Sequence, residues 1–212
     1  MNEGKECLSN LDFVCAHTKF ITALGECPES EEANFFASLT LIAGLLDTPE
    51  LKTLLDRFGV ESHGRDILSW TAGVPRDIDG KIVFPSDSPK GGEVVEYLKT
   101  DLLPHVEVAL ASLDKVGNSF SSLITFKRDA ELTEMEVDYG DAAFYRAGLL
   151  FVKSIINLIS SYDLDLDIDD TVMQFRDGTF SCIADVLGNY VNLLQLMQPH
   201  SLREFGDSFE YS

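Results

Sequence analysis

The acidic run at residues 163–170 is the densest group of potential ligands in the sequence. In an extended segment its alternating aspartates would share one face, and clustered carboxylate oxygens are typical ligands of Ca²⁺. The spacing departs from the EF-hand pattern, because the sixth and twelfth positions counted from Asp163 are Ile168 and Gln174 instead of Gly and Glu. We therefore expect at most weak Ca²⁺ binding, with the last aspartates capping a following helix. The candidate metal ligands are Asp163, Asp165 and Asp167.

Single side chains elsewhere could bind a small ligand. Arg146 lies in an apolar stretch, where its charge needs a partner, and Lys153 falls on the same helical face. We expect structural ion pairs with Asp138, Asp141 or the acidic run, and the functional alternative is an anion-binding pocket. The candidate ligand-binding residues are Arg146, His105 and the single tryptophan, Trp70, which equally fits a core or lid anchor.

No complete catalytic constellation accompanies these residues. The sequence lacks the zinc-protease, nucleophile-elbow, dinucleotide and P-loop motifs, and its four histidines are scattered. Ser181, Cys182 and Asp185 lie together, but a nucleophile needs a base beside it, and the sequence supplies none. The cysteine spacing also argues against zinc. We expect a non-enzymatic protein without a cofactor.

The charge balance limits the partners. The chain carries 16 Lys and Arg against 36 Asp and Glu, a formal net charge of −20. Such a field repels phosphate backbones and anionic lipids, so we expect neither nucleic acid nor a membrane surface as a partner. A basic protein or peptide would be attracted. The alternative is that the negative charge only keeps the protein soluble.

Apolar runs are too interrupted for a membrane helix, which needs about 18–20 such residues. The best stretch, residues 142–159, contains Arg146, Lys153 and Asn157. We therefore expect no membrane insertion. Residues 1–7 also lack the apolar core of a signal peptide.

The first fifty residues carry the clearest structural pattern. Ala16, Phe20, Ala23 and Leu24 fall on one helical face, and after Pro28 a second helix opens with Ser30 as its N-cap. Small residues in both helices would allow close approach.

This pattern resembles a tetratricopeptide repeat. The series Ala16-x3-Phe20-x2-Ala23-Leu24-x3-Pro28 is similar to the second helix of such a repeat, residues 10–13 to the turn before it, and residues 32–36 to the start of the next repeat. The resemblance covers residues 1–46. It lacks the Trp and Leu-Gly positions of the first helix and does not continue at the period of about 34 residues. It implies a helical hairpin of the kind that holds peptides or partner proteins.

A hairpin turn at residues 10–12 would place two of the four cysteines opposite each other. Cys7 and Cys15 each lie four residues from Leu11, within reach of a disulfide. Cys27 would then pair with Cys182 or stay free. Such a bridge favours an exported, periplasmic or other bacterial-envelope protein whose signal was removed upstream of Met1, whereas a cytoplasmic protein would keep the thiols reduced.

The middle of the sequence predicts short helices and a long loop. Short helices are expected within residues 47–70, and a proline-rich loop within residues 71–92. Residues 93–116 are helical, and Pro104 either kinks this helix or begins a new one.

The last third predicts a small sheet and the most apolar helix. Alternation over residues 123–137 favours a β-hairpin. Residues 141–162 are hydrophobic nearly all round and are expected to form the central buried element, and another helix is expected at residues 179–197. The predicted fold is a single, mainly α domain, a helical hairpin or bundle with a tetratricopeptide-like N-terminal part and at most a small β-hairpin. Its expected parts are 1–70, helical-repeat-like; 71–92, loop; 93–200, long helices; and 201–212, tail.

Two functions remain open from the sequence. The first is a non-enzymatic helical scaffold or module that binds a protein or peptide, as the tetratricopeptide resemblance implies. The second is a small-ligand-binding protein or enzyme with a pocket between the long helices and the loop at 71–92. A shallow groove with exposed apolar residues would favour the first, and a deep charged pocket the second.

Overall fold

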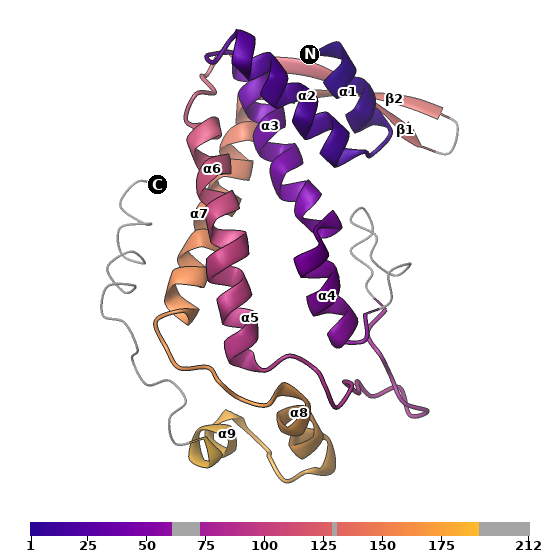
Figure 1. Cartoon of the computed structure of the whole chain (residues 1–212), viewed down its shortest axis with the longest axis vertical. Coiled ribbons are helices and arrows are strands. Elements are labelled where there is room, and N and C mark those ends of the chain that lie inside the picture. The colour runs from indigo at the N-terminus through magenta and orange to yellow at the C-terminus, as the bar shows by residue number, and fades with distance from the viewer. Residues whose placement is uncertain (61–72, 129–130, 191–212) are drawn as a thin grey trace. The chain divides into compact units, whose positions relative to one another are not determined.

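The computed structural model describes residues 1–60, 73–128 and 131–190 (Figure 1). Within these residues it is mainly helical and contains one two-stranded sheet, as the sequence predicts. The chain divides into two compact units, which are described separately. Unit 1 contains the described residues of 1–45 and 102–155, and unit 2 those of 46–101 and 156–190. Trp70 and the expected tail at 201–212 lie outside the described residues.

Unit 1 begins with three helices, α1 (Asn2–Ser9), α2 (Phe13–Glu26) and α3 (Glu31–Gly44). The Asp12 carboxylate caps α2 by accepting the backbone N–H of Cys15 at 2.9 Å. Ser30 caps α3 in the same way, as predicted. α2 packs against both α1 and α3, which gives two consecutive helical hairpins.

The core of unit 1 forms where α3 packs against α6 (Leu103–Leu113). Phenylalanine rings fill it: Phe20 stacks on Phe36 with centroids 5.3 Å apart, and Phe35 lies 5.0 Å from Phe120. The predicted apolar face of α2 is buried here through Ala16 and Phe20.

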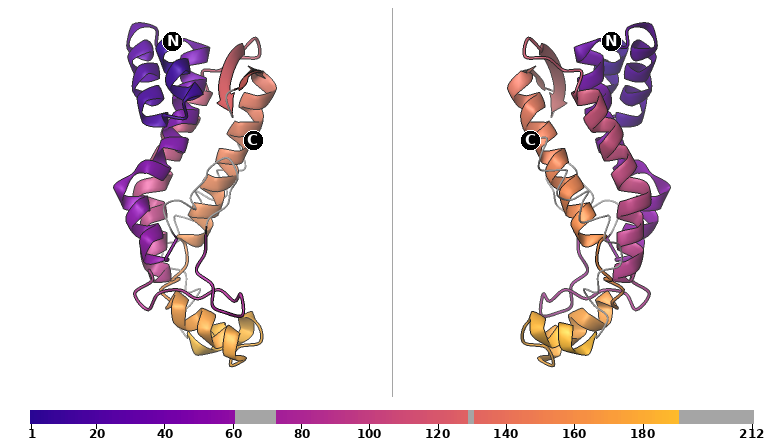
Figure 2. Two further views of the ribbon diagram at one scale, coloured as in Figure 1. Left: turned by 90° about the vertical axis from the view of Figure 1, so that its right-hand side faces the viewer. Right: turned by 90° about the vertical axis from the view of Figure 1, so that its left-hand side faces the viewer.

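The predicted hairpin consists of β1 (Ser121–Arg128) and β2 (Glu131–Asp138), paired antiparallel with Ser121 opposite Asp138. The strands lie at the N-terminal end of the helix that follows them (Figure 2). Side chains of α1 bind β1: Lys5 Nζ donates to Leu123 O at 2.9 Å, and the Ser9 hydroxyl donates to Thr125 O. These hydrogen bonds join the N-terminal hairpin to the sheet.

The long helix α7 (Tyr139–Ile159) follows β2 without a loop. Asp138 and Asp141 cap it reciprocally, since each carboxylate accepts the backbone N–H of the other. The prediction that this helix is the central buried element is wrong. Phe144 is 83% exposed and Phe151 is 61% exposed, because neighbouring elements cover only one side of the helix. Within the described residues, α7 is also the one helix whose length and composition would suffice to cross a membrane, a property that core helices share.

Unit 2 contains four short helices: α4 (Pro49–Arg57), α5 (Gly91–Tyr97), α8 (Ile168–Asp177) and α9 (Ile183–Asn189). The expected loop ends earlier than predicted, because α5 begins at Gly91. The expected helix at 179–197 begins only at Ile183, and α9 ends at Asn189; residues 191–197 are outside the described part. A π-helical segment, Leu98–Leu102, leads into α6. Pro104 has no N–H for the carbonyl of Thr100, so the α-helical ladder is interrupted there.

The extended segment before α8 runs against the start of α5. The Gly91 N–H donates to Leu166 O at 2.8 Å, and a Cβ at residue 91 would lie 2.0 Å from Leu164 O. Glycine is therefore required at this approach. Arg57 of α4 also reaches α5 by binding both carboxylate oxygens of Glu93, at 2.6 and 3.1 Å, and holds the pKa of Glu93 down at about 2.

Candidate functional site

A groove of about 370 Å³ lies in unit 1 between the C-terminal end of α6 and the first half of α7. Six of its nine lining residues have small or branched apolar side chains, and the surface that they leave open is polar and apolar in about equal parts. Tyr139, Asp114 and Arg146 add polar groups. The apolar lining residues are Leu113, Val116, Ala142, Ala143, Ala147 and Leu150.

Two ion pairs join the helices at this groove. Arg146 Nη2 lies 3.0 Å from Asp114 Oδ1, and Lys153 Nζ lies 3.0 Å from Glu107 Oε1. The two acids come from α6 and its C-cap and lie seven residues apart, and the two bases lie seven residues apart on α7. Seven residues are about two helical turns, so the second ion pair repeats the first one two turns along the antiparallel helices.

The expected partners of Arg146 and Lys153 are wrong. Asp138 and Asp141 instead cap α7. The carboxylates come from α6, more than thirty positions away in the sequence, because packing of the two helices brings them opposite the bases. Glu107 and Asp114 have the same seven-residue spacing as Arg146 and Lys153, and this match is the feature of the sequence that could have indicated the pairing.

The side chain of Tyr145 fixes the covered side of α7. Its hydroxyl donates to Ser38 O of α3 at 3.3 Å, and burial raises its pKa to about 12. The phenol therefore stays protonated near neutral pH and serves packing rather than proton transfer.

Of the other two ligand candidates, the structure describes His105 alone. His105 is in the first turn of α6, away from the groove-lining residues. The half-buried His17 is its electrostatic neighbour. His17 Nδ1 donates to Ala37 O at 3.0 Å, and burial, as the largest effect, lowers the pKa of His17. Trp70 falls outside the described residues, and of the two candidates within them, Arg146 lines the groove.

The acidic run does not gather its carboxylates around one point. Asp163 accepts the N–H of Asp165 at 3.0 Å, and Asp167 caps α8 by accepting the N–H of Asp170 at 2.9 Å. The extended segment ends at Asp167, because Asp169 already belongs to α8. The expectation that the alternating aspartates, Asp169 included, share one face of an extended segment is therefore wrong for Asp169. Across the described residues, no group of three or more His, Cys, Asp or Glu side chains could hold a metal ion.

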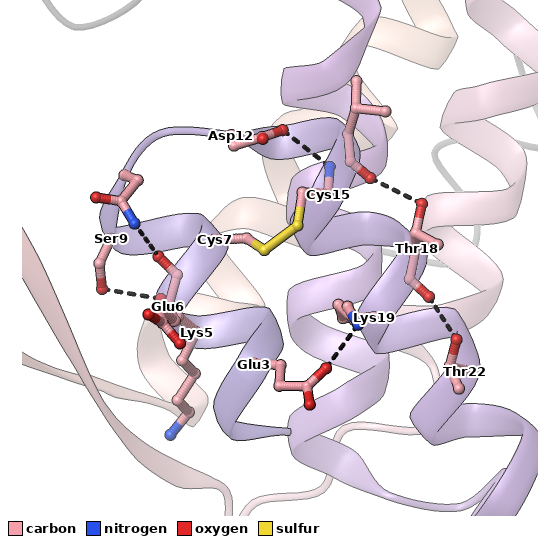
Figure 3. Close-up of a disulfide and its surroundings, with 12 residues drawn as sticks. Glu3, Lys5, Glu6, Cys7, Ser9, Asp12, Cys15, Thr18, Lys19 and Thr22 are labelled. Carbon is pink, nitrogen blue, oxygen red and sulfur yellow. Dashed lines mark hydrogen bonds and ion pairs between the residues drawn. A yellow bond between two sulfur atoms is a disulfide. The ribbon is translucent and has the colours of Figure 1, made fainter.

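A disulfide joins Cys7 of α1 to Cys15 of α2 across the turn at residues 10–12, with Cα atoms 5.8 Å apart (Figure 3). Lys19 and Glu3 form an ion pair at 2.6 Å on the same two helices. Cys27 and Cys182 are free and exposed. The disulfide therefore links α1 to α2 within the first helical hairpin and leaves the other two cysteines unlinked.

The group around Cys182 has a structural role. The Asp185 carboxylate accepts the backbone N–H groups of Ser181 and Cys182 and thereby caps α9. These hydrogen bonds hold the pKa of Asp185 below its usual range. The Asp185 carboxylate, bound in this way, stabilises the start of α9 and does not act as a base for Cys182 or Ser181.

No protein-family model matches the chain, and neither a curated protein nor a solved structure is significantly similar to it.

Proposed function

We propose that this protein is a non-enzymatic helical module that binds a protein or peptide partner, with the α6–α7 groove as its binding site. The observation that carries the proposal is the groove itself. Its small apolar side chains lie beside an acid–base pair formed by the exposed Asp114 and the half-buried Arg146. Peptide-binding grooves between helices combine an apolar floor with polar groups that orient the ligand in the same way.

The size of the groove supports a peptide over a large cofactor. Its volume of about 370 Å³ is near the lower end of the roughly 300–1,000 Å³ of ligand pockets. Ala143 and Ala147 are exposed at the surface of α7, so side chains of an approaching helix can reach the groove beside them. A few apolar anchors of a peptide fill such a space.

The charge of the chain supports a basic partner. With a net charge of −20, the protein attracts cations over a range set by the ionic strength. Asp114 is 59% exposed at the groove and can accept a hydrogen bond from a lysine or arginine of the partner. The proposed ligand is therefore an amphipathic segment with apolar anchors and basic flanks.

A small anion is the second candidate, favoured by the presence of Arg146 in the groove wall. Arg146 already donates through Nε to Asp114 at 3.0 Å, so an anion would compete with this carboxylate. A lysine of the peptide would compete with Arg146 for Asp114 in the same way, so the apolar lining residues and the net charge, not this pair, favour the peptide.

The test is fluorescence anisotropy with a labelled 14-residue peptide of leucine and lysine in amphipathic helical spacing. A leucine–glutamate peptide of the same pattern controls for charge. Ala143→Phe fills the groove from an exposed position of α7, and Ala111→Phe places the same ring at an exposed position of α6 outside the groove lining. We expect the lysine peptide to bind and Ala143→Phe to weaken binding at least tenfold, with Ala111→Phe near wild type. Equal affinities of the two variants would show that the groove is not the site.

A further inference from the structure

The outer face of α7 carries an apolar stripe that is separate from the groove. Phe144, Gly148, Phe151 and Ile155 follow one another at intervals of four, three and four residues, the spacing of a single helical face. Phe144 is 83%, Phe151 61% and Ile155 38% exposed. The groove uses a different set of α7 residues, so α7 presents two faces.

Gly148 is not needed for a close approach within the described part of its own chain. Glycine is less favourable than alanine in the interior of a helix, and Gly148 lies in the middle of the 21 residues of α7. No heavy atom of the described residues lies within 4 Å of a Cβ built at this position, whereas a Cβ at Gly4 would lie 2.7 Å from the ring of Phe20. Close approach of a helix from outside the chain would explain a glycine at this place.

The stripe is complementary to itself in the antiparallel direction. If a two-fold axis passes between residues 149 and 150, Gly148 of one copy faces Phe151 of the other, and Phe144 faces Ile155. Each large side chain then meets a small or branched one, so a ring can enter a notch as a knob enters a hole. We propose that this protein forms an antiparallel dimer through α7, with Phe151 of each copy packed against Gly148 of the other.

The charge of the protein determines how this dimer responds to salt. The stripe is about 16 Å long, which is short for a stable interface, and each copy carries a net charge of −20. The repulsion is screened as the Debye length falls from about 30 Å at 0.01 M salt to about 8 Å at 0.15 M. The dimer therefore tightens with salt, whereas a basic partner on the same stripe would dissociate with salt.

The experiment is sedimentation equilibrium of the full chain from 10 µM to 1 mM at 0.01, 0.15 and 0.5 M NaCl. A Cys27→Ser, Cys182→Ser background prevents intermolecular disulfides between the two exposed thiols and leaves the Cys7–Cys15 bridge intact. We expect a monomer–dimer equilibrium whose Kd falls at least threefold between 0.01 and 0.5 M NaCl.

Gly148→Leu is the decisive variant. Its Cβ meets nothing in the described part of its own chain, and its side chain would fill the notch for Phe151. We expect the dimer to be lost while the melting temperature stays equal or rises, since leucine is the better helix former. Gly25→Leu is the matched control, because Gly25 is an exposed helical glycine of α2 that also has nothing within 4 Å, and it should leave the dimer unchanged.

Either of two results would overturn the dimer. One is a wild-type protein that stays monomeric at 1 mM and at every salt concentration. The other is a Gly148→Leu variant that dimerises like the wild type. Binding of a monomer to neutral phosphatidylcholine vesicles, abolished by Phe144→Ser, would assign the stripe to a membrane instead. None of these results bears on peptide binding in the groove, which is measured separately.

Discussion

Arg146 on α7 and Asp114, the C-cap residue of α6, form an ion pair in which both Nε and Nη2 of the arginine lie 3.0 Å from Oδ1 of the aspartate. A negative charge at the C-terminal end of a helix is unfavourable with respect to the helix dipole, and the arginine offsets it. The pair also neutralises the acid that lies in the groove. Its removal should therefore change binding more than folding.

We expect Arg146→Met to strengthen binding of the leucine–lysine peptide several-fold, because Asp114 is then free to bind a lysine of the peptide. The free energy of unfolding should change by less than about 1 kcal/mol, as for other exposed ion pairs. Fluorescence anisotropy and thermal melting measure the two effects. Lys153→Met is the matched control, since it removes the same charge from the same helix at a residue outside the groove lining. Equal gains in both variants would mean that only the net charge matters.

The Cys7–Cys15 bridge should stabilise unit 1 by about 2 kcal/mol, the value expected from chain entropy for a loop of this short length. Thermal melting of the Cys7→Ser, Cys15→Ser double variant against the oxidised protein measures this loss. Thiol counting on unfolded, unreduced protein should find two free thiols, Cys27 and Cys182, and four after reduction. Four thiols before reduction would contradict the bridge and, with it, the predicted export of the protein.

Gly4→Ala and Gly25→Ala should have opposite effects on stability. A methyl group at residue 4 would lie 2.7 Å from the ring of Phe20, which is fully buried and stacked on Phe36. Because this ring is buried and packed on Phe36, we expect a loss of about 1–3 kcal/mol, as for other overpacked cores. A methyl group at residue 25 meets nothing and should be neutral or stabilise the helix by up to about 1 kcal/mol. Denaturant unfolding of both variants measures the difference, and equal stabilities would show that α1 does not pack on Phe20.

The protonation of His17 should make the protein less stable in mild acid. Burial lowers the pKa of His17 in the folded protein below the ordinary histidine value of 6.5, so the unfolded chain binds the proton more readily. Stability is therefore greatest above pH 6.5 and falls as the pH decreases from 6.5 through the lowered pKa. Melting temperatures of the wild type and His17→Gln between pH 7.5 and 5 measure this effect, and we expect a smaller decrease for the variant. A decrease of the same size in both proteins would assign the acid sensitivity to other groups.

Local sequence patterns predicted most of the secondary structure. The side chains that begin helices act within three residues, so Ser30 identified the start of α3. Alternating residues predicted the hairpin of β1 and β2 for the same reason. The boundaries that differ are set by local caps that helical periodicity does not reveal. The Glu93 carboxylate accepts the N–H of Lys90, so α5 begins at Gly91, and Asp185 caps α9, so that helix begins only at Ile183.

The sequence by itself determined that the chain is mainly helical and acidic, and which side chains share a face of each helix, because these properties depend on composition and on spacing within a few residues. Only the tertiary structure decided that Asp114 and Glu107, rather than Asp138 and Asp141, bind the two bases of α7. It also decided that one side of this apolar helix stays exposed through Phe144 and Phe151. Hydrophobic attraction has no direction, so an apolar helix can be covered from any side, and only the packing of segments distant in sequence selects the side that is buried.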